Sequence, residues 1–171
     1  MRKFVAAGGL LVLALALVGA ASAGKVGFAK TWVYDPGNTG DAVAEWTKDG
    51  LSLQKNAPTN VEVAAGAEIK GVEGELLAQL SFDVKGYCGA GAPRFNVYTQ
   101  SATYFIGCTY GDPTDLGDGW TRVTFSGDEI GGIGAFGSVM NGVDIVQDEE
   151  GATLLRNISV NGVVIDKFPN G

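Results

Sequence analysis

Polar and aromatic residues alternate with apolar ones along several short segments, and together they have the chemistry of a sugar-binding surface. A pyranose ring offers a C–H face that stacks on Trp or Tyr and hydroxyls that hydrogen-bond to Asp, Asn and Arg. In an extended strand over residues 94–98, Phe95 and Val97 lie on one side, and the polar residues that flank them lie on the other. If the neighbouring strands share a sheet with this one, its non-core side forms a ligand-binding face. The predicted face consists of Asp83, Arg94, Asn96, Tyr98, Tyr104, Trp120 and Arg122.

The same residues also fit an ordinary half-exposed sheet. A short turn would place Tyr98 opposite Tyr104, where the two rings would stack, and Asp83 would form an ion pair with Arg94 or Arg122. This alternative needs no ligand. The sequence leaves both interpretations open.

The composition excludes several classes of function. The chain has 171 residues, no histidine, two cysteines, and 12 Lys and Arg against 19 Asp and Glu. Without histidine, the Ser-His-Asp and Cys-His triads and the commonest zinc ligand are missing. The formal charge of −7 argues against binding to nucleic acid, which needs clustered Lys and Arg. We expect no enzyme, because no pair stands out among the carboxylates that a glycosidase could use; a carboxylate-based glycosidase is the alternative. The available carboxylates are Glu45, Glu68, Glu73, Glu75 and Asp83.

Residues 1–23 have the form of a signal peptide: a short cationic start, an apolar run and a small-x-small cleavage pattern. An uncleaved anchor is the alternative, because the 20 uncharged residues from Phe4 to Ala23 are about long enough to span a bilayer. We predict cleavage, which leaves residues 24–171 as a single exported domain without a membrane span. Its two cysteines, Cys88 and Cys108, are then predicted to form a disulfide in an oxidising compartment.

Short segments of alternating residues, separated by Gly, Asn, Asp and Pro, predict an all-β fold, a two-sheet antiparallel sandwich of jelly-roll type. An Asn161-Gly162 turn favours a final hairpin. Trp32 and Trp46 are interpreted as core or sheet-edge residues. The expected strands are Ala29–Tyr34, Leu51–Lys55, Ala67–Glu73, Leu77–Lys85, Arg94–Gln100, Thr103–Cys108, Trp120–Ser126, Gly142–Gln147, Thr153–Val160 and Val163–Lys167.

Two acidic segments, Asp35–Asp41 and Gly111–Gly119, are interpreted as ordinary loops. Turn chemistry alone places Asp, Asn, Pro and Gly there, and neither segment has the spacing of a calcium-binding EF-hand. The glycine-rich segment Gly127–Val139 is expected to be a loop or a single helical turn. We expect no metal site and no cofactor, with a structural calcium ion as the alternative.

Segments 80–83, 88–97, 119–123 and 157–162 resemble a group of small secreted bacterial proteins of unassigned function, and this resemblance implies no activity. More loosely, the strand order is similar to galactose-binding-like jelly rolls, the fold of many carbohydrate-binding modules, which implies glycan binding. Such modules often hold a structural calcium ion next to an Asp in the last strand. This chain has Arg156-Asn157 there instead of Asp-Asn.

These observations predict a secreted, non-catalytic module that recognises an extracellular glycan. The alternative is a structural or interaction protein of the cell envelope, without a small-molecule ligand. The expected partner is a glycan or an envelope component, and neither nucleic acid nor a membrane.

Overall fold

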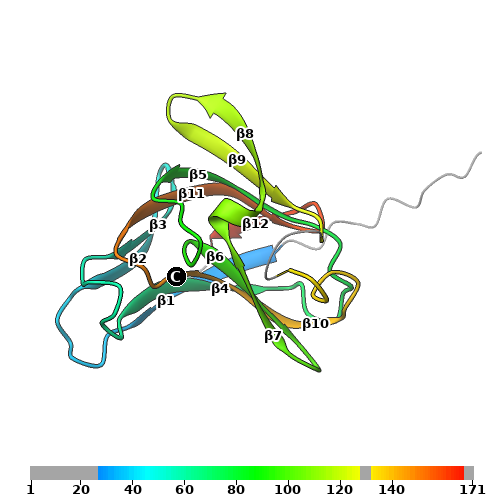
Figure 1. The fold of residues 1–171 in the computed structure, drawn as a ribbon, viewed down its shortest axis with the longest axis horizontal. Coiled ribbons are helices and arrows are strands. Elements are labelled where there is room, and N and C mark those ends of the chain that lie inside the picture. Colours follow the sequence, from blue (N-terminus) through cyan, green and yellow to red (C-terminus); the bar gives the residue numbers. More distant parts are fainter. Residues whose placement is uncertain (1–26, 128–131, 168–171) are drawn as a thin grey trace, which may run out of the picture.

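The computed structural model describes residues 27–127 and 132–167, which form strands and one short 3-10 helix in two facing layers (Figure 1). The predicted signal peptide lies outside the described residues. Within them, no helix is long and apolar enough to cross a membrane. The elements are β1 (Gly27–Tyr34), β2 (Ala42–Thr47), β3 (Gly50–Lys55), β4 (Ala64–Lys70), β5 (Leu80–Gly86), β6 (Arg94–Thr99), β7 (Thr103–Gly107), η1 (Cys108–Tyr110), β8 (Asp112–Gly117), β9 (Trp120–Phe125), β10 (Met140–Gln147), β11 (Gly151–Val160) and β12 (Val163–Lys167).

The layers are two sheets joined along one edge. Sheet A has the order β7-β6-β10-β4-β1, and sheet B has the order β8-β9-β5-β11-β3-β2. Strand β12 connects them, because it pairs with β11 in antiparallel fashion and with β1 in parallel fashion. The predicted all-β sandwich is therefore confirmed.

Both sheets contribute to a common aromatic core. Phe82 of β5 and Phe125 of β9 come from sheet B, and Phe95 of β6 comes from sheet A. Their ring centroids lie 5.4, 5.7 and 5.8 Å apart, and all three side chains are fully buried. Because side chains alternate along a strand, these phenylalanines fix which residues point inward and which point outward in each sheet.

The β6–β7 hairpin differs from the predicted register by one residue. Its two-residue loop pairs Tyr98 with Thr103 and Val97 with Tyr104. A one-residue shift moves every side chain of a strand to the other face. Tyr104 therefore packs against the core, and Phe105 takes its place on the outer face, where it is exposed.

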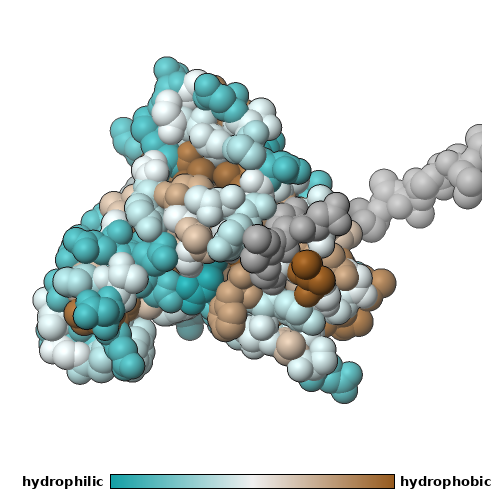
Figure 2. Space-filling view, viewed as in Figure 1, coloured by the Kyte–Doolittle hydropathy of each residue, from teal (hydrophilic) through white to brown (hydrophobic). Residues whose placement is uncertain are grey.

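Two tight turns and a disulfide shape the remaining connections. Asn161 has φ 52° and Gly162 has φ 78°, the left-handed pair of a two-residue hairpin, so the predicted turn is confirmed. The acidic segment predicted as a loop is instead the hairpin β8–β9, with its turn at Asp118-Gly119. Figure 2 shows hydrophobic atoms gathered beneath this hairpin.

The predicted disulfide between Cys88 and Cys108 is confirmed. The two Cα atoms lie 5.3 Å apart, and the bond ties the loop after β5 to the short helix η1. Strand β2 was not expected from the sequence. It pairs along its whole length with β3 and closes one edge of sheet B.

Candidate functional site

The residues predicted to share one face lie on opposite sides of the sandwich. Phe82 and Phe95 meet in the core from different sheets, so the outward neighbours Asp83 and Asn96 point in opposite directions. Arg94, Asn96 and Tyr98 lie on the outer side of sheet A, whereas Asp83, Trp120 and Arg122 lie on the outer side of sheet B. The single predicted face is therefore wrong, because alternation defines the two sides of a strand but not the sheet to which the strand belongs.

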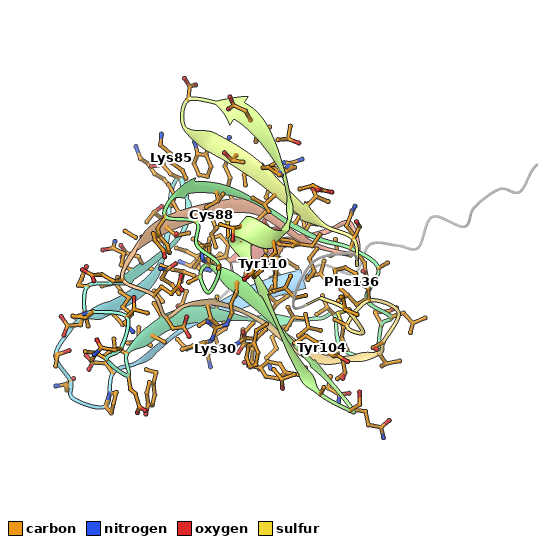
Figure 3. All side chains as sticks on the ribbon, viewed as in Figure 1. Lys30, Lys85, Cys88, Tyr104, Tyr110 and Phe136 are labelled. Atoms are coloured by element: carbon orange, nitrogen blue, oxygen red, sulfur yellow. A yellow bond between two sulfur atoms is a disulfide. The ribbon has the colours of Figure 1, made fainter. Side chains whose placement is uncertain are left out.

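The outer side of sheet A brings together residues from four strands in register. In one row across the sheet, Asn96 faces Asp144, Asp144 faces Glu68, and Glu68 faces Lys30. In the next row, Trp32 faces Gly66. Figure 3 shows Lys30 beside sheet A and Lys85 on the opposite side of the molecule, beside sheet B. We call the outer side of sheet A the Trp32 face. It consists of Lys30, Trp32, Tyr34, Glu68, Lys70, Arg94, Asn96, Tyr98 and Asp144.

Trp32 forms an aromatic platform on this face. Its indole ring lies over Gly66, where a Cβ atom would come within 2.3 Å of Cζ2 and 2.5 Å of Cε2. Only a glycine leaves room for the ring, and Trp32 is half-buried against the sheet. Beyond Ala29, β1 pairs only with β4 within the described part of the chain, so of the two positions expected for Trp32, core and sheet edge, the structure shows the sheet edge. Trp46, by contrast, packs against the core and donates its indole N–H to the Ala29 carbonyl at 3.2 Å.

The centre of the Trp32 face holds two adjacent carboxyl groups, Asp144 and Glu68. Burial raises the pKa of Asp144, and the charge of Glu68 adds to that rise. The Tyr98 hydroxyl donates a hydrogen bond to Asp144 Oδ2 at 3.0 Å, which acts in the other direction. Lys70 forms an ion pair with Glu68, and this contact raises the pKa of Lys70. The face thus carries closely spaced groups that accept and donate hydrogen bonds.

Arg94 stands at one end of this face and is largely committed to the fold. Its Nε donates to Asn96 Oδ1 at 2.8 Å, its Nη1 donates to the Gly91 carbonyl at 2.8 Å, and it forms an ion pair with Asp148. Its guanidinium also lies 5.3 Å from the centre of the Phe105 ring. With a side chain only 16% exposed, Arg94 has little left to offer a ligand.

The outer side of sheet B is organised around Asp83. This carboxylate is 1% exposed and accepts hydrogen bonds from Arg122 Nε at 2.6 Å, Asn157 Nδ2 at 2.7 Å and Arg156 Nε at 3.4 Å. Burial alone would raise the pKa of Asp83, but these hydrogen bonds and the charge of Arg122 lower it overall. The ion pair of Asp83 with Arg122, expected for an ordinary sheet, is confirmed.

Trp120 is not a platform of the same kind. It is 8% exposed, and the Arg156 guanidinium covers it at 3.9 Å from the ring centre. Arg156 and Asn157 were not grouped with Asp83 from the sequence. Arg156 is the cross-strand partner of Asp83, and the bulge that follows it in β11 brings Asn157 to the same carboxylate. Asn157 adopts φ 48° at this bulge, a left-handed conformation that Asn tolerates better than most residues.

The acidic side chains are also candidate metal ligands. Within residues 27–127 and 132–167, no three Cys, Asp or Glu side chains gather into a group that could hold a metal ion. The Asp35 carboxylate stabilises the turn that follows it, because it accepts a hydrogen bond from the Gly40 N–H, with 2.7 Å between N and Oδ2. The backbone N–H groups of Thr39 and Gly40 lower the pKa of this carboxyl.

No protein-family model matches the chain, and no curated protein matches it. Among solved structures, a carbohydrate binding module of family 29 is 10% identical, with a TM-score of 0.46 over 76% of this chain and 75% of that chain. A variant of the family 29 module CBM29-2 is 10% identical, with a TM-score of 0.47 over 78% and 81%. A further family 29 variant is 11% identical, with a TM-score of 0.46 over 76% and 78%.

Proposed function

We propose that this chain is a secreted, non-catalytic module that binds an extracellular glycan on the Trp32 face. The observation that supports it most is the indole of Trp32, which lies over Gly66 beside a row of polar side chains. A flat aromatic ring next to carboxylate, amide and ammonium groups matches the two sides of a sugar, its C–H face and its hydroxyls.

The extent of the face suits a chain of sugars better than a single ring. Trp32 lies over Gly66 on β4, and the Tyr98 ring lies beside Gly142 on the neighbouring strand β10. Gly66 is paired with Val146, four positions from Gly142, so strand geometry separates the two rings by about 14 Å. The carboxyl groups described above lie between them, where they would accept hydrogen bonds from hydroxyls.

The position of Asp144 favours ligand binding over a purely structural role. Its pKa is raised by burial and by Glu68, so its ionised form reduces the stability of the fold at neutral pH. Destabilising titratable groups concentrate at functional sites. Asp144 and Glu68 are cross-strand neighbours on one surface, whereas the carboxyl groups of a glycosidase flank the bond that they cleave. The arrangement therefore favours binding over hydrolysis.

Secretion is part of the same proposal. The N-terminal segment reads as a signal peptide, and the Cys88–Cys108 disulfide is typical of proteins in an oxidising compartment.

The test is a glycan-array screen of residues 24–171, with and without calcium, followed by titration of the glycans that bind. Trp32→Ala removes about half of the roughly 200 Å² of a Trp side chain as a stacking surface, worth about 2.5 kcal/mol or roughly 70-fold in affinity. Gly66→Ala should weaken binding as well, by displacing the ring. Tyr110→Ala, which removes a 37% exposed aromatic on η1, is the matched control and should have no effect.

A blank array, or binding of a neutral glycan that survives Trp32→Ala unchanged, would overturn the proposal. A blank array together with a partner captured from intact cells would favour the alternative, an envelope protein without a small-molecule ligand. Release of reducing sugar from a bound glycan would instead indicate an enzyme.

A further inference from the structure

A groove opens on sheet B, on the side of the molecule opposite the Trp32 face. One edge of β11 pairs with β3 up to Leu155 and with β12 from Ser159, so residues 156–158 have neither partner on that edge. The groove lies against this gap and has a volume of about 720 Å³. That volume is in the range of small-molecule sites in proteins.

The charge of this groove is opposite to that of the chain. Four cations line it and two carboxylates face them, which leaves a formal +2 in a chain whose formal charge is −7. Among the described residues, no ion pair joins any of these cations to either of these carboxylates. We call this site the Arg156 groove, and its charged lining residues are Lys48, Asp49, Lys85, Arg156, Asp166 and Lys167.

Arg156 is held in place with its hydrogen-bonding edge open. Its Nε points to the buried carboxylate of Asp83 at 3.4 Å, and its guanidinium lies on Trp120 at 3.9 Å from the ring centre. The side chain is still 42% exposed, and within the described residues neither of its Nη atoms has a hydrogen-bond partner. A guanidinium fixed on a ring and a carboxylate loses little conformational freedom when it binds an oxyanion through two parallel N–H groups.

Lys85 stands on the neighbouring strand β5 and completes a cationic pair with Arg156. Its Nζ donates to the Asp118 carbonyl at 2.9 Å and lies 5.9 Å from the centre of the Trp120 ring. Lys85 and Arg156 therefore flank one indole, and each leaves donors unused.

We infer that the Arg156 groove binds the oxyanion of an acidic glycan, a carboxylate or a sulfate ester, with Arg156 and Lys85 as its donors. The inference rests on the proposed function for the class of ligand, but it uses different residues on the opposite side of the molecule. Asp49 and Asp166 favour a sugar over a dense polyanion, because they accept hydrogen bonds from hydroxyls and repel closely spaced phosphates.

The experiment compares trigalacturonate, a sulfated galactose trisaccharide and neutral galactotriose by isothermal titration at low salt. We expect one acidic probe to bind at least about tenfold more tightly than the neutral one, with affinity that falls as salt is added. Tighter binding of trigalacturonate identifies the carboxylate, and tighter binding of the sulfated probe identifies the sulfate ester.

Variants separate this site from the Trp32 face. Arg156→Gln should lower the affinity for the acidic probe by about tenfold, and Arg156→Lys should restore only part of it. Lys85→Gln, which leaves the contacts of Asp83 in place, should also lower this affinity by about tenfold. Tyr110→Ala, which lies outside both the groove lining and the Trp32 face, is the control and should leave the affinity for the acidic probe unchanged. Trp32→Ala tests the proposed function and should leave acidic binding intact. Equal affinity for all three probes, or full binding by both groove variants, would overturn the inference.

Discussion

The two aspartates at the centres of the two outer faces should respond to the same substitution with opposite signs. Asp144→Asn removes a negative charge that faces Glu68, and the new amide can still accept the hydrogen bond from Tyr98. A like-charged pair directly across two strands costs up to about 1 kcal/mol. We therefore expect Asp144→Asn to raise the free energy of unfolding by about 1 kcal/mol at neutral pH.

Asp83→Asn is the matched comparison. Asp83 is buried and accepts from Arg122, Arg156 and Asn157, so an amide there would direct an N–H group toward other donors. Loss of a buried charge-assisted network of this kind costs about 3 kcal/mol. The free energy of unfolding should fall by that amount at neutral pH.

The pH dependence gives the sign of each effect. The folded-state pKa of Asp144 is raised, so the gain from Asp144→Asn is present above that pKa and disappears as pH falls toward the ordinary value of about 3.9. The folded-state pKa of Asp83 is lowered, so the loss in Asp83→Asn is present above about 3.9 and shrinks as pH falls below it. Urea titrations of both variants at about pH 7, about pH 4 and about pH 3 measure this, because the change for Asp83→Asn appears only at the lowest of these values.

A destabilised Asp144→Asn variant at neutral pH would refute the electrostatic reasoning. The same variant also tests function. If the Asp144 carboxylate binds the glycan, Asp144→Asn should lower the affinity for that glycan. Gain of stability without loss of binding would assign Asp144 to the sheet surface alone.

Three further results are expected. Lys55→Met should lower the free energy of unfolding by about 3 kcal/mol in guanidinium titrations, because the buried ammonium binds three backbone carbonyls at 2.6, 2.8 and 3.1 Å; a loss below about 1 kcal/mol would contradict this. Reduction of the Cys88–Cys108 disulfide should lower the thermal midpoint, since the loop closure is worth about 3 kcal/mol; an unchanged midpoint would argue against that contribution. Arg94→Ala should lower the midpoint in calorimetry through its lost contacts, and an unchanged midpoint with lost glycan binding would make Arg94 a ligand contact instead.

Local patterns in the sequence were sufficient for the fold class and for the inward residues of several strands. Alternation around Phe95 and Val97 predicted the side that became the core, and the Asn161-Gly162 pair predicted its hairpin. These features depend on neighbours within a few residues along the chain.

The candidate site depends on long-range pairing, which alternation does not encode. Asp83 and Asn96 lie in strands that look alike in sequence but belong to different sheets. The single face predicted from the sequence therefore mixed residues from two separate surfaces. Trp32 became a candidate only once β1 was paired with β4, because Gly66 leaves the space that the ring occupies. Gly66 lies one residue before the predicted strand Ala67–Glu73, and the observed strand β4 includes it, so the available signal was a glycine at the beginning of a predicted strand.

The most direct test of the central proposal uses the three tryptophans as separate probes. A two-dimensional ¹H–¹⁵N spectrum of residues 24–171 contains one indole signal for each of Trp32, Trp46 and Trp120, which Trp→Phe variants would assign. On titration with a neutral glycan that binds in the array, the Trp32 signal should shift with the ligand, while the signals of Trp46 and Trp120, which line the Arg156 groove, should stay in place. A Trp32 signal that does not move at saturation would contradict the account.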